Sequence, residues 1–196
     1  MKKREASKAR KTGETTVALR LGLDGTGRVS LATGVAFFEH MLTLFARHGF
    51  FDLDLEAEGD LPVDAHHLVE DVGLVLGDAF AEALGDKAGI SRYGSVLLPM
   101  DEALVLVAVD LSGRPFLGFK LDLPTTRLGN FETELVEEFL RAFVNRAKCT
   151  LHVQQLAGSN THHLIEAVFK GLGRALDEAT ALEPRLNGIP STKGIL

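Results

Sequence analysis

Two short histidine-rich blocks hold the side chains of this sequence that are best suited to chemistry. The first, His66–Glu70, reads HHLVE, and the second, His162–Glu166, reads HHLIE, so they are 96 residues apart (162 − 66). On a helix, residues i and i+4 share a face and lie about 6 Å apart along the axis. The first histidine and the glutamate of each block can therefore reach one metal ion, whereas the second histidine, rotated by about 100°, points elsewhere. Two such blocks predict two metal sites.

Two further residues extend these sets. The segment Phe38–Leu42 aligns with Val136–Leu140 at an offset of 98 (136 − 38), which makes His40 and Glu138 structural equivalents. Each block would give one histidine and its glutamate to one ion, and its other histidine to the second ion. Such ligands suit manganese, iron, zinc or cobalt, and the lack of a thiolate favours a six-coordinate Mn²⁺-like ion. The resulting assignment places His66, Glu70, Glu138 and His162 on one ion, and His40, His67, His163 and Glu166 on the other.

The alternative interpretation of these blocks is structural. A histidine on an amphipathic helix is usually a surface or hydrogen-bonded residue, and a His–Glu pair at i,i+4 can be a plain ion pair. Two blocks in register, with His40 at the matching place, favour metal binding.

A second group of residues could bind an anion. Arginine offers a planar fork to phosphate, lysine a point charge and serine a hydroxyl donor. Each such residue alone is more often a solvated charge or part of a salt bridge. Lys170, however, lies four residues after Glu166 and so projects beside the metal ligands. The anion-binding candidates are Arg92, Arg114, Lys170, Ser191 and Lys193.

Two more side chains could enter such a site. Glu14 precedes the first predicted strand, where a carboxylate could reach the site from the end of the chain. His48 lies eight residues after His40, slightly more than two helical turns, and so faces the same side (48 − 40).

The elements that must position these residues follow from hydrophobic periodicity. Alternating apolar residues predict strands, and apolar residues three to four positions apart predict helices. In the first half, the turn at Asp24–Gly27 further predicts that the first two strands form a hairpin. The first-half strands are Thr15–Leu23, Arg28–Leu31 and Phe51–Leu55, and the helices are Phe37–His48 and His66–Leu84. The second-half strands are Ala103–Asp110, Phe116–Leu121 and Leu151–Val153, and the helices are Glu132–Asn145 and His162–Ala179.

Each half is thus predicted to be a β-β-α-β-α unit, and the chain an α+β protein with internally duplicated halves. Pairing the two mixed sheets would pack the helices between them. The predicted divisions of this single structural domain are a flexible basic N-terminus at 1–13, a first half-repeat at 14–90, a second half-repeat at 91–183 and a C-terminal substrate-binding tail at 184–196.

Composition limits the classes of function. With a net charge of −6 over 196 residues, no general affinity for nucleic acid is expected. Basic residues crowd the first dozen positions, which indicates a solvated, frayed end rather than a nucleic-acid arm. Cys149 is the only cysteine, which fits a reducing cytoplasm, and we expect it to be a small core residue. No apolar run approaches the ~20 residues of a membrane span, and no signal peptide is evident.

Several stretches closely resemble the imidazoleglycerol-phosphate dehydratase family, whose members act in histidine biosynthesis. The resemblance covers the chain from about residue 10 and is carried by Arg10–Thr15, Phe38–Leu42, His66–Asp71, Ser112–Pro115, His162–Lys170 and Ser191–Gly194. It implies a duplicated α/β fold, two Mn²⁺ ions per subunit, and a twenty-four-subunit shell with active sites between neighbouring subunits. The metal ligands would be those assigned above, with Glu138 standing where many members have histidine. The residues implied to contact substrate are Glu14, His40, His48, Arg92, Arg114, Lys170, Ser191 and Lys193, the basic ones holding its phosphate.

The implied reaction removes water from D-erythro-imidazole-glycerol phosphate and yields imidazole-acetol phosphate. The hydrogen on C2 of the substrate is not acidic, because no carbonyl neighbours it. We hypothesise that the two ring nitrogens coordinate two cations, that the resulting imidazolate expels the adjacent hydroxyl, and that a carboxylate takes the C2 proton from the diazafulvene. Glu14 is the candidate for this proton transfer, with a ligand glutamate (Glu70 or Glu166) or a metal-bound water as competitor, and His48 completes the catalytic set.

Two other classes of function compete with this one. A dinuclear metallohydrolase that cleaves a phosphate ester would also use paired metals and basic residues. A metal-tied assembly or an RNA-binding module of similar architecture would not be an enzyme at all. The acidic net charge and the lack of a basic, aromatic sheet surface argue against RNA.

Overall fold

The structure is a computed structural model that describes residues 3–196. In the first half, the strands are β1 (Glu5–Lys11), β2 (Thr16–Gly22), β3 (Val29–Ala32) and β4 (Asp52–Glu58), and the helices are α1 (Ala36–His48) and α2 (His66–Leu84). In the second half, the strands are β5 (Tyr93–Met100), β6 (Ala103–Asp110), β7 (Phe116–Lys120) and β10 (Thr150–Ala157), and the helices are α3 (Leu135–Ala147) and α4 (Thr161–Thr180). The short strands β8 (Arg127–Leu128) and β9 (Phe131–Glu132) precede α3.

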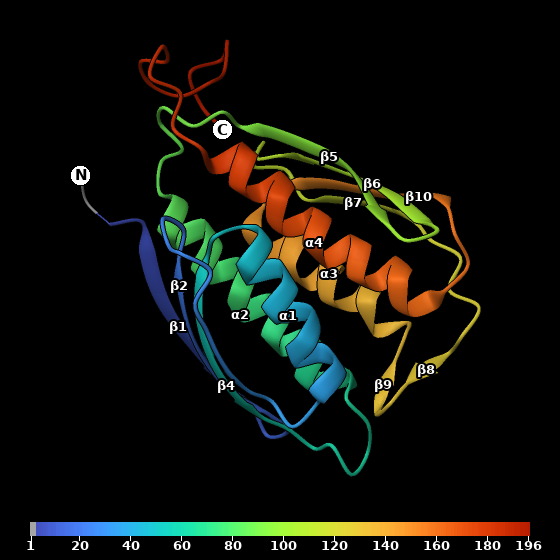
Figure 1. Cartoon of the computed structure of the whole chain (residues 1–196). Helices are drawn as coiled ribbons and strands as arrows, with labels where there is room; N and C mark the ends of the chain where they lie inside the picture. Colours follow the sequence, from blue (N-terminus) through green and yellow to red (C-terminus); the bar gives the residue numbers. More distant parts are fainter. Residues whose placement is uncertain (1–2) are drawn as a thin grey trace.

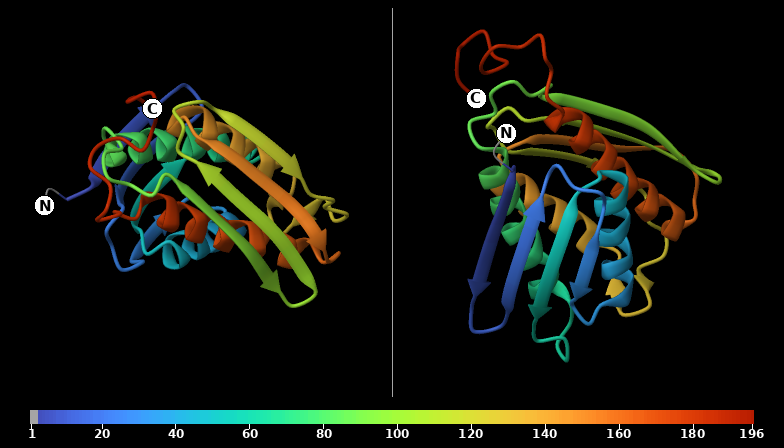
Figure 2. Two further views of the ribbon diagram at one scale, coloured as in Figure 1. Left: turned by 90° about the horizontal axis from the view of Figure 1, so that it is seen from above. Right: turned by 60° about the vertical axis from the view of Figure 1, so that its left-hand side comes forward.

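The four helices form a layer between two four-stranded mixed sheets, which confirms the predicted α+β class (Figure 1). The strand orders are β1-β2-β4-β3 and β5-β6-β10-β7. Helix α2 packs on β1 and β2, α4 packs on β5 and β6, and the two helix pairs are α2 with α3 and α1 with α4. Figure 2 shows the two sheets on opposite sides of this layer. Both histidine blocks open long helices of the layer, so their side chains lie where helix meets helix.

The inward faces of the strands supply much of the core. Val17, Leu19 and Leu21 of β2 are buried, and the residues between them are exposed. The residues of β6 alternate in the same way. This period of two is the expected pattern for a sheet with one face against the helices.

The four-stranded sheet of each half contains one strand more than the sequence pattern predicts, and the short pair β8 and β9 was not predicted either. Residues 1–13 were expected to form a frayed, solvated N-terminus, but Glu5–Lys11 pairs antiparallel with β2, from Glu5 opposite Gly22 to Lys11 opposite Thr16. The basic side chains of β1 hid this strand, because charged residues are typical of a sheet edge and obscure the apolar alternation. Residues 1–2 of that predicted segment lie outside the described residues. In the second half, β5 fills the corresponding place beside β6.

The predicted hairpin of the first half is wrong, because β4 lies between β2 and β3. Strand β4 pairs antiparallel with β2 and parallel with β3. Asp52 at the start of β4 accepts hydrogen bonds from the backbone N–H groups of Thr26 and Arg28, at 2.9 and 3.0 Å. These bonds tie the connecting turn to β4. Alternation alone cannot reveal this partner choice, because it marks which face is buried and not which strand is adjacent.

Matched glycines let the helices of one half approach those of the other half closely. A Cβ on Gly77 of α2 would lie 2.6 Å from the carbonyl oxygen of Phe143, and one on Gly173 of α4 would lie 2.3 Å from that of Phe45. The glycines are 96 residues apart (173 − 77) and the phenylalanines 98 apart (143 − 45), the same offsets that relate the histidine blocks and the segments around His40 and Glu138. The duplication therefore includes the helix contacts that set the metal-ligand positions.

We expect Gly173→Ala to destabilise the protein. Alanine gains up to about 1 kcal/mol in helix propensity, but its Cβ would meet a backbone oxygen that cannot rotate away, and overpacking costs about 1–3 kcal/mol. Urea unfolding should show a net loss of about 1 kcal/mol or more. Gly22→Ala is the control, since its Cβ would lie 3.7 Å from that of Asp52. An unchanged midpoint for Gly173→Ala would contradict the close packing.

Within residues 3–196, no helix is both long and apolar enough to cross a membrane. The tail from residue 184 is irregular, and it is held against the segment that joins the two halves. Gly89 donates its N–H to the carbonyl of Gly188 at 2.8 Å, and Arg92 donates to the carbonyl of Pro190 at 2.9 Å.

Candidate metal centre

His40, His162 and Glu166 form a compact group of metal-ligand atoms at the contact of α1 with α4. Glu166 Oε1 lies 2.8 Å from His40 Nε2 and 3.2 Å from His162 Nε2. One donor atom from each residue lies within 4.8 Å of the other two. Glu166 is 7% exposed, whereas His40 is exposed, so the group is anchored on its inner side and open on its outer side. Two imidazole nitrogens and a carboxylate oxygen suit a divalent transition-metal ion with further positions free.

The i,i+4 spacing predicted that His162 and Glu166 reach the same ion, and their geometry agrees. Within one chain, His162 lies with Glu166 and His40 rather than with His66, Glu70 and Glu138, and His163 is not part of this group. Successive helix residues are rotated by about 100°, so only one histidine of each block can face its glutamate. His163 instead points to the β5–β6 turn, where its Nδ1 lies 2.7 Å from Glu102 Oε2.

The charge of Glu166 is well supported. Burial opposes its ionisation, but hydrogen bonds from Lys170, His40 and His162 outweigh that cost and lower the pKa of Glu166 to about 2. Lys170 Nζ lies 2.6 Å from Glu166 Oε2, beside the ligands, as its spacing predicts. Glu166 is therefore a carboxylate at neutral pH, which is the form that binds a cation.

A second group gathers around the other block. Ligand atoms of Glu14, Asp60 and His67 lie within 4.8 Å of one another. His67 Nδ1 is 3.0 Å from Asp60 Oδ2 and 3.7 Å from Glu14 Oε2, and the hydrogen bond with Asp60 raises the pKa of His67. His67 and His163 are thus placed alike, each with Nδ1 toward a carboxylate, and Nε2 of His163 also lies 3.7 Å from Asp101 Oδ2.

The remaining predicted ligands lie at the contact of α2 with α3. By the duplication, His66, Glu70 and Glu138 correspond to His162, Glu166 and His40. A Cβ on Gly73 would lie 2.8 Å from the carbonyl oxygen of Phe139, so α2 and α3 approach closely here. Gly73 is three residues after Glu70, and Phe139 is the residue after Glu138. All three side chains are half-buried. Among residues 3–196, their donor atoms do not meet the 4.8 Å spacing of the two groups above.

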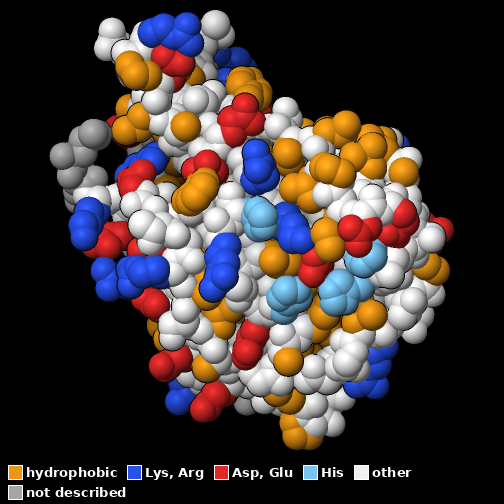
Figure 3. All heavy atoms as spheres, in the orientation of Figure 1, with side chains coloured by type: hydrophobic (Ala, Val, Ile, Leu, Met, Phe, Trp, Pro, Cys, Tyr) orange, Lys and Arg blue, Asp and Glu red, His pale blue; other side chains and the backbone are white. Residues whose placement is uncertain are grey.

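His48 lies farther along the same face of α1 as His40. It lines a pocket of about 580 Å³ together with Arg47, Phe50, Ser95, Val96, Arg174, Asp177 and Glu178. Burial and the positive charges of Lys170 and Arg174 lower the pKa of His48, so it is neutral at pH 7. Figure 3 shows histidine and basic side chains side by side on this face.

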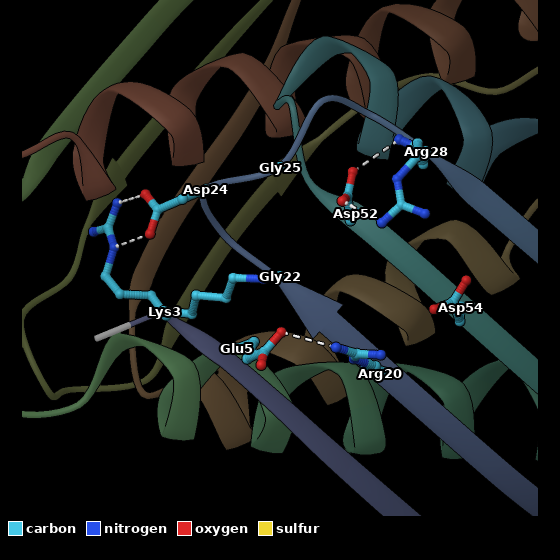
Figure 4. Close-up of a pocket in the computed structure, with 10 residues that line it drawn as sticks. Lys3, Glu5, Arg20, Gly22, Asp24, Gly25, Arg28, Asp52 and Asp54 are labelled. Carbon is cyan, nitrogen blue, oxygen red and sulfur yellow. Dashed lines mark hydrogen bonds and ion pairs between the residues drawn. The ribbon is translucent and has the colours of Figure 1, made fainter. Parts of the chain in front are cut away.

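A charged groove on the outer side of the first sheet is different in kind (Figure 4). Most of its acids and bases are paired with each other: Glu5 with Arg20, Asp52 with Arg28, and Asp24 with Arg4. These pairs hold strand ends and turns together, so the groove is structural.

The other anion-binding candidates lie far from the metal group. Arg92 pairs with Asp110 at 2.7 Å, and its N–H is bonded to the carbonyl of Ala179 in the last turn of α4. Glu166 is 13 residues earlier on this helix (179 − 166), or about 20 Å at 1.5 Å per residue. Ser191 and Lys193 follow Pro190, whose carbonyl accepts a hydrogen bond from Arg92. The turn that contains Arg114 packs on the end of the chain, since a Cβ on the neighbouring Gly113 would touch Leu196. One chain therefore does not bring these residues and the metal group into one site.

Comparison with known proteins decides the family. Residues 33–176 match the profile described as Imidazoleglycerol-phosphate dehydratase. The chain belongs to this family. Proteins of that name from Acetivibrio thermocellus and Moorella thermoacetica are each 62% identical to it, over 96% of both chains in the first case and 98% of both in the second. Dehydratases are hydro-lyases, so the chain is an enzyme of that class.

Solved structures of the imidazoleglycerol-phosphate dehydratase family share the fold. The enzyme from Staphylococcus aureus superimposes with a TM-score of 0.83 at 42% identity, covering 91% of this chain and 99% of that one. The Pyrococcus furiosus enzyme, in complex with (S)-C348, gives a TM-score of 0.84 at 36% identity, covering 96% of this chain and 100% of that one.

Three acidic residues at the site were not among the predicted site residues of this dehydratase-family chain. Asp60 and Glu102 orient His67 and His163, and nothing in the sequence marks these loop acids as partners of histidines. Asp71 follows the first block directly, and there a signal was available, because the matching position of the second block holds Ala167. A charged residue in only one of two duplicated motifs indicates a partner outside the motif.

Proposed function

We propose that this chain converts D-erythro-imidazole-glycerol phosphate to imidazole-acetol phosphate and water in histidine biosynthesis. The observation that carries the proposal is the convergence of His40, His162 and Glu166, in a chain of this family. Lys170 beside this group adds a positive charge for an anionic substrate.

We further propose two Mn²⁺ ions per subunit. His40, His162 and Glu166 would hold one ion, and His66, Glu70 and Glu138 the other. Bound to the ring nitrogens of the substrate, the cations would act as Lewis acids that stabilise negative charge on the ring. His67 and His163, whose rings are oriented by Asp60 and Glu102, would complete these sites from neighbouring copies of the chain.

The chain's own residues move the proton. Glu14 lies on the exposed β1–β2 turn and has no bonded partner nearer than His67, so its carboxylate is free to accept the C2 proton. Overall, the C2–H bond and the bond from the adjacent carbon to its hydroxyl break, and an enol double bond forms between these carbons. The proton taken by Glu14 balances the departing hydroxide, so water is lost. The enol then tautomerises to the ketone, while His48 contacts substrate as a neutral imidazole.

The separation of the basic residues supports a site shared between subunits. Arg92 lies about 20 Å along α4 from Glu166, too far for one small substrate to reach both. Ser191 and Lys193 follow Pro190, whose carbonyl Arg92 binds, and Arg114 lies in the turn beside the end of the chain. We propose that a neighbouring copy supplies them to hold the phosphate, within the twenty-four-subunit shell. The buried thiol of Cys149, whose pKa is raised to about 12 by burial, fits a protein of the reducing cytoplasm.

The decisive assay follows both products of imidazole-glycerol phosphate. The proposal predicts formation of the ketone, with phosphate remaining esterified. Release of inorganic phosphate without ketone would instead identify a metallohydrolase. Binding of metal without turnover of either kind would leave a structural role for the metal.

A further inference from the structure

The residue after the first histidine block, Asp71, is a buried carboxylate that the second half lacks. Asp71 is 7% exposed, and 96 positions later (167 − 71) the chain has Ala167. Burying an ionised carboxylate is costly unless it is paired and hydrogen-bonded. Its presence in only one half therefore points to a task that only this half performs.

Both carboxylate oxygens of Asp71 hold the β1–β2 hairpin. Arg10 Nε of β1 donates to Oδ1 at 2.6 Å, and the hydroxyl of Thr15, just before β2, donates to Oδ2. Thr15 is itself only 3% exposed. Asp71 thus joins helix α2 to both sides of the turn between the two strands.

The turn is also closed by its own hydrogen bonds. Thr12 Oγ1 accepts the N–H groups of Glu14 at 3.1 Å and of Thr15 at 2.9 Å, and it lies 3.1 Å from Thr15 Oγ1. The Thr12 N–H donates to the Thr15 carbonyl at 2.9 Å. Fixing Thr15 therefore fixes the backbone of Glu14, whose side chain remains exposed.

The matching turn of the second half is held in another way. There Glu102 itself binds the start of α4, accepting from the Asn160 N–H at 2.9 Å and from His163. The hydrogen bond with His163 and, to a smaller extent, that from the Asn160 N–H lower the pKa of Glu102 to about 2. The carboxylate of Glu102 thus anchors its turn, whereas that of Glu14 lies only 3.7 Å from His67 Nδ1 and, within residues 3–196, makes no hydrogen bond to α2, because Asp71 anchors the β1–β2 turn.

We propose that Asp71 is a positioning residue for Glu14. Through Arg10 and Thr15 it sets the turn at a fixed place relative to α2, which also carries His66, His67 and Glu70. The proton acceptor and the metal-ligand helix then form one rigid unit. This inference rests on the proposed function, in which Glu14 accepts the C2 proton.

The test is a double-mutant cycle between Asp71→Ala, which copies the residue of the second half, and Glu14→Gln. Because a displacement of about 1 Å at a reacting group can cost 10²-fold, we expect Asp71→Ala to lower kcat about 10- to 100-fold. KM should stay within about threefold, because substrate binding is not removed. In the Glu14→Gln background, Asp71→Ala should lower kcat further by less than about twofold, since it acts only through Glu14.

Asp78→Ala is the matched control, since Asp78 lies on the same helix and pairs with Arg146 at 2.7 Å away from the turn. Its kcat should equal that of the parent, and its metal content should equal that of Asp71→Ala. Thr15→Val and Thr15→Ser give an independent measure if Asp71→Ala folds poorly. The serine variant keeps the hydroxyl and should retain kcat within about threefold, whereas the valine variant should show the full loss.

The outcomes separate the two levels of the inference. Near-normal turnover of Glu14→Gln would overturn the assignment of Glu14, and the role of Asp71 with it. An impaired Glu14→Gln combined with a fully active Asp71→Ala, or with losses that simply multiply in the double variant, would overturn the role of Asp71 alone. Equal kcat values for Thr15→Val and Thr15→Ser would do the same.

Discussion

Glu14→Gln is expected to lower kcat about 10²- to 10⁴-fold, the usual contribution of a positioned general acid or base. The amide keeps the size of the side chain but cannot accept the C2 proton. Substrate affinity should change little, because the phosphate and the ring are held by other residues. Steady-state kinetics of ketone formation measures both quantities.

Glu5→Gln is a suitable control for this variant. Glu5 is an exposed carboxylate on β1, the strand before the turn that carries Glu14, and it pairs with Arg20 at 3.0 Å on the outer side of the sheet. It should leave turnover unchanged. Near-normal kcat in Glu14→Gln would exclude Glu14 as the base and leave the ligand glutamates, Glu70 and Glu166, as candidates.

Removal of divalent cations with a chelator should abolish dehydration, and Mn²⁺ should restore it. A Lewis acid supplies several kcal/mol of charge stabilisation, so the rate should fall at least about 10³-fold. If ligands come from different chains, cation loss should also shift a large particle toward smaller species. Activity and sizing are measured on one chelated sample before and after Mn²⁺ is added.

Two histidine variants make the metal experiment specific. His162→Ala should lose cation affinity, because it removes one donor of the group around Glu166. His152→Ala is the control, since His152 is exposed on β10 and contacts Phe116 in a tilted arrangement with ring centroids 5.4 Å apart. Equal metal content in the two variants, or a chelated enzyme with full activity, would contradict the proposed role of the cluster.

The helices were predictable because their apolar spacing is long and regular. The sequence placed α2 at His66–Leu84, and the structure gives the same bounds. The strands β1 and β5 were missed, because the basic residues of β1 and the proline near the end of β5 weaken the alternation. The position of β4 between β2 and β3 depends on contacts far apart in sequence, such as that of Asp52 with Thr26.

The site was predictable in its residue types and less so in its grouping. The i,i+4 rule placed His162 with Glu166. The partners of the second histidine of each block, His67 and His163, depend on how the helices are oriented in the fold. Which acids orient His67 and His163 could not be foreseen, because Asp60 and Glu102 come from loops. The distance of Arg92 from Glu166 could not be predicted, because it depends on the packing of Arg92 against the far end of α4.

Anomalous diffraction at the manganese edge, from crystals grown with Mn²⁺, tests the central claim most directly. We predict one peak bonded to His40 Nε2, His162 Nε2 and a Glu166 oxygen, and a second bonded to His66, Glu70 and Glu138. Well-ordered crystals with those side chains in place and no anomalous peak between them would contradict the account.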